Sequence, residues 1–299
     1  MLYSISDLEK LSGIQAHTIR IWEQRYQALQ PLRSAGNTRH YEDSQLKRLL
    51  NIVSLSESGL KISQICALSD EDMKGLIQKD IEVTSAITEQ FEPHISQLII
   101  SGLAYDEVAI DQLLSNCIKQ YGLADTYKKI IYPLLLRLGL LWQKDSICPA
   151  QEHFLSSLIR QKLFAAIDTL PPAINAKATW LLFLPEGEEH DIGLLFAKYL
   201  LRNFGEKVIY LGSHVPMSSL IGALKENKVD HLLFFMTQAR LTTDAQKYLN
   251  SLAEQFPTIQ IHLSGSSKLI TDLNMPKQVT WFKNIETLES FIHPNETSK

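Results

Sequence analysis

Residues Trp180–Gly193 read WLLFLPEGEEHDIG, a short apolar run followed by an acidic loop with one histidine. Trp180–Leu184 is continuously apolar, which is typical of a strand buried on both faces. The expected strands are 180–184, 208–211, 232–236, 259–263 and 279–282, and the expected helices between them are about 191–204, 217–227, 242–255 and 267–274. Strands that alternate with helices predict a parallel, Rossmann-like (flavodoxin-like) sheet domain over residues 178–299.

The acidic loop lies where such a domain would bind a ligand, because ligands of open parallel sheets bind beyond the carboxyl ends of the strands. His190 in this loop could meet a ligand or a metal. Glu188 could accept the second ring proton of His190, as carboxylates do for metal-ligating histidines. Gly193 permits close approach of a bulky group. A surface acidic loop with an incidental histidine is the alternative interpretation of the same residues.

Residues 76–172 predict a four-helix bundle. Apolar residues recur at helical spacing in four segments of about 80–101, 104–120, 123–143 and 149–169, which short connections separate. Pro171-Pro172 then begins a linker.

Residues 1–75 predict a winged helix-turn-helix. Short helices precede and follow a hairpin whose Gly36-Asn37 centre suits a turn that needs positive φ. The basic residues of this region lie on the second helix, around the hairpin and in the following helix; they are Arg20, Arg25, Arg33, Arg39, Lys47 and Arg48, against Glu23, Glu42 and Asp43. This pattern fits a basic helix and a wing that contact DNA, or a small helical domain with a solvated charged face.

The composition agrees with a globular protein of about two or three domains. The chain has 299 residues, of which 45% are hydrophobic and 21% charged. We expect no membrane helix, no secretory signal and a cytoplasmic location, because no long apolar run occurs and the three cysteines are few and far apart. A nucleic-acid binder with a net charge of −4 must gather its basic residues locally.

The first 70 residues resemble the MerR family of transcription regulators. Tyr3–Leu8 and Thr18–Tyr26 (TIRIWEQRY) resemble the start and the recognition helix of that family, and Arg33…Gly36…Arg39…Tyr41 resembles its wing. The resemblance implies contacts of double-stranded operator DNA with Thr18, Arg20, Arg25 and Tyr26 from the helix and with Arg33, Asn37, Arg39 and Tyr41 from the wing. Trp22 fits a core position at least as well as a DNA contact.

The rest of the chain resembles the cobalamin-dependent MerR-type photoreceptor regulators of the CarH and LitR group. Glu188-x-His190-x-x-Gly193 resembles the cobalamin-binding motif ExHxxG, and Tyr210-Leu211-Gly212-x-x-x-Pro216 resembles the next loop of that domain. Trp142, nine residues and then Glu152-His153 resemble the motif Wx9EH of the bundle. The resemblance implies that His190 coordinates cobalt from below, and that Trp142, Glu152 and His153 cover the upper face of an adenosyl- or methylcobalamin.

Three places depart from that pattern, and the first is Gln143 after Trp142, which provides no imidazole for the upper face of cobalt. Phe235-Met236-Thr237 stands where the family has SxL, and Ser264-Gly265 stands where it has GG. In the family these small residues line the tunnel for the dimethylbenzimidazole tail, so Thr237 and Gly265 remain expected cofactor contacts while Phe235 and Ser264 narrow the passage. We expect cobalamin to bind weakly as a result.

Three functions compete at this stage. The resemblance implies a non-enzymatic regulator whose cobalamin-binding sensory module controls operator binding and self-association into a dimer or tetramer. The second possibility is the same regulator with a degenerate pocket that binds another ligand, or none, and serves for oligomerisation. The third is a corrinoid enzyme module, against which the helix-turn-helix counts; no P-loop, nucleophile elbow or paired-carboxylate signature occurs.

Overall fold

The computed structural model describes residues 2–12, 14–34, 37–57, 60–73, 75–76, 91–142, 149–237 and 242–293. The chain divides into two compact units, Met1–Ile159 and Arg160–Lys299, with the boundary inside helix α9 (Pro149–Asp168). The finer division into domains 1–75, 76–172 and 178–299 stays a prediction. Among the described helices, none is both long and apolar enough to cross a bilayer.

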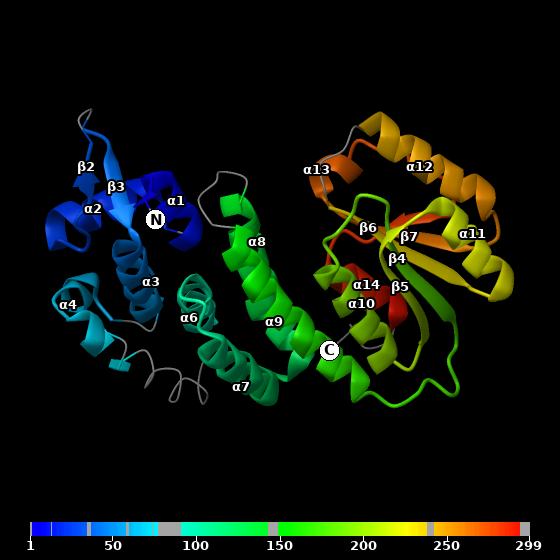
Figure 1. The fold of residues 1–299 in the computed structure, drawn as a ribbon, viewed down its shortest axis with the longest axis horizontal. Coiled ribbons are helices and arrows are strands. Elements are labelled where there is room, and N and C mark those ends of the chain that lie inside the picture. The colour runs from blue at the N-terminus through cyan, green and yellow to red at the C-terminus, as the bar shows by residue number, and fades with distance from the viewer. Residues whose placement is uncertain are drawn as a thin grey trace. The chain divides into compact units, whose positions relative to one another are not determined.

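The N-terminal part is the expected winged helix-turn-helix. Its elements are β1 (Leu2–Tyr3), α1 (Ile5–Ser12), α2 (Ala16–Tyr26), β2 (Leu32–Arg33), β3 (Arg39–Glu42), α3 (Asp43–Glu57) and α4 (Ile62–Cys66) (Figure 1). The strands form an antiparallel sheet in the order β1-β3-β2, in which β1 is an addition that the sequence did not predict. Asn37 has φ 59°, in agreement with the positive φ expected at the hairpin; Gly36 lies outside the described residues.

The helices of the bundle follow the predicted order. They are α6 (Glu92–Leu103), α7 (Glu107–Thr126), a π-helical turn (Tyr127–Ile131), α8 (Tyr132–Trp142) and α9. Gly122 adopts φ 76° and ψ 161° inside α7, so the helical geometry breaks where the sequence predicted a boundary between two helices. The expected start of the first bundle helix, near residue 80, lies outside the described residues. Helix α6 packs against α3, where Gln97 Nε2 donates to Asn51 Oδ1 at 3.3 Å.

The C-terminal unit is the predicted parallel α/β domain. Its elements are β4 (Thr179–Pro185), α10 (Ile192–Asn203), β5 (Lys207–Val215), α11 (Met217–Glu226), β6 (His231–Met236), α12 (Thr242–Gln255), β7 (Gln260–Gly265), α13 (Ser267–Ile270), β8 (Val279–Trp281) and α14 (Ile285–Ile292). The strand order is β5-β4-β6-β7-β8, and every adjacent pair is parallel. The sequence analysis missed α14, although a capping box of Asn284 and Thr287 begins it.

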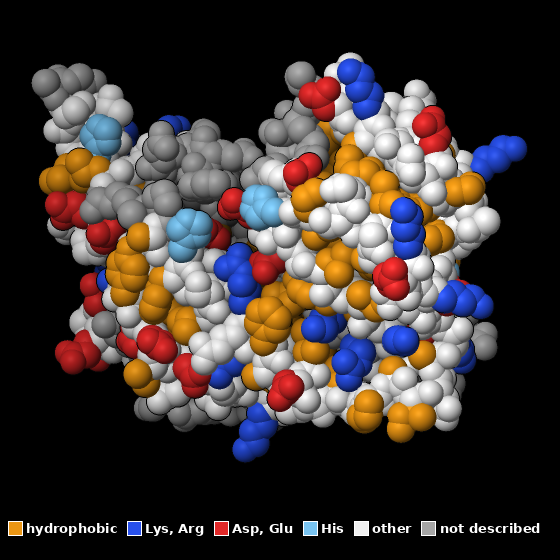
Figure 2. Space-filling view, turned by 45° about the vertical axis from the view of Figure 1, so that its right-hand side comes forward, with side chains coloured by type: hydrophobic (Ala, Val, Ile, Leu, Met, Phe, Trp, Pro, Cys, Tyr) orange, Lys and Arg blue, Asp and Glu red, His pale blue; other side chains and the backbone are white. Residues whose placement is uncertain are grey.

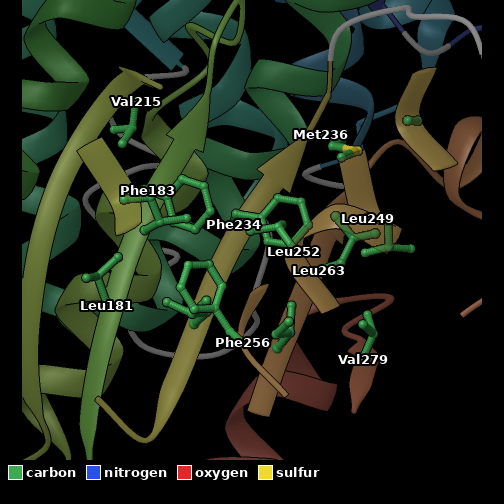
Figure 3. Packing of buried hydrophobic residues seen from close by; sticks show 14 of the residues in the cluster. Leu181, Phe183, Val215, Phe234, Met236, Leu249, Leu252, Phe256, Leu263 and Val279 are labelled. Carbon is green, nitrogen blue, oxygen red and sulfur yellow. The ribbon is translucent and has the colours of Figure 1, made fainter. Parts of the chain in front are cut away.

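The two faces of the sheet have different cores. Figure 3 shows one face, where Phe183, Phe234, Met236 and Leu263 pack with side chains of α12 such as Leu249. Helices α11, α12 and α13 cover this face. The alternate strand residues face the other way, where α10 and α14 lie.

The second face contains a cluster of histidine and aromatic rings. The ring of His262 stacks on Phe282 at 4.7 Å and on Trp180 at 5.0 Å, and its Nε2 lies 3.1 Å from Nδ1 of His231. His262 is fully buried, and its Nδ1 has no hydrogen-bond partner. Burial, with a further contribution from the neighbouring His231, lowers the pKa of His262 to about 3. Both histidines are therefore neutral in the fold at pH 7, since burial lowers the pKa of His231 as well.

This cluster predicts that acid destabilises the domain. The folded pKa of His262 lies below the value of about 6.5 expected for an unfolded histidine, so its contribution is complete above pH 6.5 and is lost as the pH falls towards 3. The loss amounts to at most about 1.4 kcal/mol per pH unit. Urea unfolding at pH 7 and pH 5 measures this change in the free energy of unfolding. The free energy of unfolding of His262→Phe should depend less on pH than that of the natural chain. The control His17→Ala, at an exposed position, should show the same pH dependence as the natural chain. Equal pH dependence in His262→Phe and the natural chain would contradict this origin.

Candidate functional site

The strand order places a topological switch point at β4, at the carboxyl edge of the sheet. Strand β4 lies between β5 and β6 in the sheet. The chain continues from β4 to β5 on one side of it and then crosses to β6 on the other side. Such a switch point is where open α/β sheets bind ligands. The loop that carries Glu188 and His190 follows β4 directly, and Thr237 follows β6. The expected site residues therefore flank the switch point.

Glu188 holds these segments together. Its side chain is completely buried, and its Oε1 accepts hydrogen bonds from His190 Nδ1 at 2.7 Å and Thr237 Oγ1 at 2.6 Å. The Thr237 backbone N–H donates to Oε2 at 2.7 Å. A buried carboxylate needs such donors, because an uncompensated charge in the interior is strongly unfavourable. The predicted Glu188–His190 pair thus exists, and Thr237 anchors it to the neighbouring strand.

The hydrogen bond to Glu188 sets the chemistry of the His190 ring. A carboxylate acceptor places the proton on Nδ1, so Nε2 carries the lone pair. The side chain of His190 is 46% exposed, in contrast to the buried Glu188. Among the described residues, no group of three or more His, Cys, Asp or Glu side chains is arranged to hold a metal ion. The oriented imidazole of His190 could supply one ligand, through Nε2, to a metal that another group also holds.

Two glycines bring backbone and side chains close together around this edge. At Gly193, in the first turn of α10, a Cβ atom would lie 3.0 Å from Cε1 of Phe235. At Gly265, φ is 129° and a Cβ atom would lie 2.1 Å from the carbonyl oxygen of Met236. Gly265 thus lets the end of β7 turn beside the end of β6. The ring of Phe235 occupies the space next to Gly193.

Two further contacts were not expected from the sequence. Ser264 Oγ donates to the carbonyl oxygen of Phe282 at 2.9 Å, so this hydroxyl has a structural partner. His214, with φ 56° at the end of β5, places Nε2 3.2 Å from Oε1 of Glu189. Adjacent carboxylates in one loop thus contact two different histidines. The spacing of Glu189 and His214 gave no signal for this pair, because the two residues come from different strand ends.

The bundle carries the other expected cofactor residues. Trp142 is the last residue of α8, and its side chain lies outside the described part of the structure. Glu152 and His153 lie in the first turn of α9, with Oε2 of Glu152 3.1 Å from Nδ1 of His153. The His153 side chain is 70% exposed. Its exposure leaves the imidazole accessible to a ligand.

Four of the expected DNA contacts lie on exposed surface of the N-terminal part. Arg20 and Arg25 are exposed on α2, and Arg33 and Asn37 are exposed on the hairpin, where Arg33 Nη1 donates to Asn37 Oδ1 at 2.5 Å. Thr18 and Tyr26 are partly buried on α2. Figure 2 shows Lys and Arg side chains as well as Asp and Glu side chains on the face in view.

The last two wing residues differ from the rest. Tyr41 is fully buried, and its hydroxyl donates to Glu23 Oε2 at 3.0 Å. The expected contact of Tyr41 with DNA is therefore wrong, because this ring belongs to the core of the wing. Arg39 Nε donates to Glu23 Oε1 at 2.9 Å, which raises the pKa of Arg39 and ties the wing to α2. The sequence analysis did not identify Glu23 as the centre of this contact.

Arg48 is also structural. It donates to the carbonyl oxygens of Ala28, Cys66 and Leu68 and pairs with Asp70. It thereby joins α3 to the segments after α2 and α4 and contributes little net charge to a DNA surface.

Comparisons with known proteins agree with both halves of this description. Residues 3–71 match the family model described as MerR HTH family regulatory protein, and residues 95–166 match the B12 binding domain. The chain is 28% identical to the HTH-type transcriptional repressor CarH of Myxococcus xanthus over 260 residues, 85% of each chain. It is 29% identical to the repressor CarA of the same organism over 242 residues, 80% of this chain and 78% of CarA.

A solved structure shares the fold of about two thirds of this chain. The monomethylamine corrinoid protein of Methanosarcina barkeri matches with a TM-score of 0.52 and 16% identity, over 65% of this chain and 94% of that one. Together the matches define a DNA-binding transcription regulator. The chain is thus similar to MerR-type regulators, and it contains a segment that matches the B12 binding domain.

Gly265 gives a prediction about this edge of the sheet. Gly265→Ala should destabilise the chain by about 3 kcal/mol, because the new methyl group meets the Met236 carbonyl and the φ of 129° is strained for alanine. In the control Gly222→Ala, on α11, the new methyl group meets no atom within 4 Å. This change should increase the free energy of unfolding by up to about 1 kcal/mol. Urea unfolding measures both, and a neutral Gly265→Ala would contradict the close approach of β6 and β7.

Proposed function

We propose that the chain is a cytoplasmic, non-enzymatic regulator that binds operator DNA through its winged helix-turn-helix and a corrinoid through its α/β unit. The observation that carries the second part is the Glu188–His190 pair, anchored to Thr237 at the switch point of the sheet. CarH and CarA are named repressors, and their likeness to this chain supports the first part.

His190 would supply the lower axial ligand of the corrinoid through Nε2. When bound, the corrinoid supplies a cobalt ion whose upper position can carry an alkyl group. Glu188 orients the imidazole and increases its basicity, as a carboxylate does for other metal-ligating histidines. Trp142, Glu152 and His153 of the bundle would cover the upper face. The residues present thus fit a cobalt ion that His190 ligates.

The DNA surface would consist of α2 and the hairpin. Arg20 and Arg25 would enter the major groove with α2, assisted by Thr18 and Tyr26, while Arg33 and Asn37 would contact the backbone from the wing. Arg39 would act chiefly by positioning the wing through Glu23. One winged helix-turn-helix covers too little DNA to be specific alone, so we propose binding as a dimer to two related half-sites.

Contacts within the first unit would couple ligand to DNA. Helix α6 packs on α3, and α8, which ends at Trp142, packs on α1. Asn51 is a buried polar residue at the first of these contacts and accepts from Gln97. Cover of a corrinoid by α8 and α9 would therefore bias helices that support the helix-turn-helix. We propose that this bias controls self-association and operator binding.

A second candidate is the same regulator with no corrinoid, in which the C-terminal unit serves for oligomerisation. The observation in its favour is the ring of Phe235, which lies against Gly193. A chain that binds operator DNA but shows no spectral change with any corrinoid would favour this candidate.

DNA binding gives one prediction. Arg20→Ala should weaken operator binding and lower the slope of log affinity against log salt concentration by about one, because one phosphate contact is lost. Arg39→Ala should also weaken binding, with a smaller change of slope, because Glu23 already neutralises this charge. Lys225→Ala, on exposed α11, is the control and should change neither quantity. Fluorescence anisotropy over a salt series measures them, and unchanged affinity and slope in both arginine variants would refute the placement.

Cobalt ligation gives another prediction. Diaquocobinamide has no internal base, so any nitrogen ligation in its complex comes from the protein, and the visible spectrum reports it. His190→Ala should abolish this spectral change, and Glu188→Gln should weaken binding by about 10–100-fold. The neighbouring change Glu189→Gln is the matched control and should leave it intact. Binding of the natural chain should weaken as the pH is lowered, because coordination needs an unprotonated Nε2.

The spectrum of His190→Ala decides the assignment. The same imidazole-type spectrum in that variant and in the natural chain would show that His190 is not the ligand.

A further inference from the structure

On the face of the sheet where α10 and α14 lie, side chains occupy the space next to the start of α10. Phe235 lies on β6 and faces the first turn of α10, where a Cβ at Gly193 would touch its ring at 3.0 Å. In the sheet register Phe235 is paired with Ser264 of β7, so the two side chains share one face. The hydroxyl of Ser264 is bonded to the Phe282 carbonyl. The Phe235 ring thus lies between the first turn of α10 and the end of β6, and its register partner Ser264 is bonded to the segment after β8.

The same face stays filled further along the strands. His262 lies two residues before Ser264 on β7, and its ring is stacked between Trp180 and Phe282. Phe291 of α14 packs against His262 at 4.8 Å and against Phe282 at 5.4 Å. His262 is fully buried in this stack. An aromatic ring of a ligand could enter between this face and its helices only by displacing several of these packed rings.

The chemistry of a complete cobalamin conflicts with this packing. Its nucleotide tail is attached on the lower side of the corrin, the side that His190 would approach. When a protein imidazole takes the lower axial position, the tail must leave the cobalt and lie beside that imidazole. Gly193 follows His190 by three residues and the Phe235 ring lies against it, so a tail that passed beside Gly193 would meet this ring. The residues fit the metal but not the tail.

We propose that the site takes a corrinoid without its nucleotide tail, of the cobinamide class, and that Phe235 determines this specificity. This inference rests on the proposed function, since it assumes that His190 ligates the cobalt. Overpacking against the partly buried Phe235 corresponds to a loss in affinity of about 10- to 100-fold. The tail-free ligand avoids that loss because it places nothing beside Phe235.

The test compares two cobinamides with the natural, full-length chain. One is diaquocobinamide, and the other is GDP-cobinamide, which carries a bulky nucleotide arm whose guanine does not compete for cobalt. Absorbance titration should show that the natural chain binds diaquocobinamide at least about tenfold more tightly. Phe235→Ser should reduce this preference to less than about threefold by raising the affinity for GDP-cobinamide. Phe235→Leu, which keeps a large side chain in place, is the matched control and should retain the preference.

The outcomes separate this inference from the function beneath it. Equal affinity of the natural chain for both ligands, with His190-dependent spectra, would overturn the tail-free specificity and leave corrinoid binding in place. Binding of neither ligand would overturn the proposed corrinoid function itself. A preference that persists unchanged in a folded Phe235→Ser protein would show that another group excludes the nucleotide and would overturn the assignment to Phe235. The comparison in the natural chain holds even where a variant fails to fold.

Discussion

The buried carboxylate of Glu188 is the contact on which the functional edge of the α/β unit depends. It accepts hydrogen bonds from the imidazole of His190 and from both donors of Thr237, and it joins the loop after β4 to the end of β6. These two strands meet at the switch point of the sheet, so one side chain both links the segments that follow them and fixes the tautomer of the histidine. Without that carboxylate, His190 Nδ1 and both donors of Thr237 would lose these hydrogen bonds.

The order of the elements could be predicted from the sequence because each local pattern agreed with its neighbours. The apolar runs from Trp180 onwards mark the strands of the sheet, and Gly122 marks the break in the bundle where the periodicity stops. The pair of Glu188 and His190 was visible because the two residues lie two positions apart. By contrast, β1 has two residues and gives no sequence pattern, and α14 was missed although a capping box begins it.

Contacts between distant segments could not be predicted. The buried position of Tyr41 and the ion pair of Arg39 both depend on Glu23, which lies at least 16 residues away on another element. The sequence of a wing motif is the same whether its polar side chains face DNA or the recognition helix. The contact of Phe235 with Gly193 is similar: the substitution was visible in the sequence, but the helix that its ring would meet was not. Such pairings depend on tertiary packing rather than on local pattern.

Ligation of cobalt by His190 is the central claim, and electron paramagnetic resonance tests it most directly. The Co(II) form of cobinamide has no nitrogen of its own in the axial position, so any splitting from an axial nitrogen originates in the protein. The complex with the natural chain should show three-line splitting from one nitrogen-14 nucleus, and protein grown with nitrogen-15 histidine should show two lines. A bound Co(II) complex without nitrogen splitting, or one whose splitting is unchanged by labelled histidine, would contradict the account.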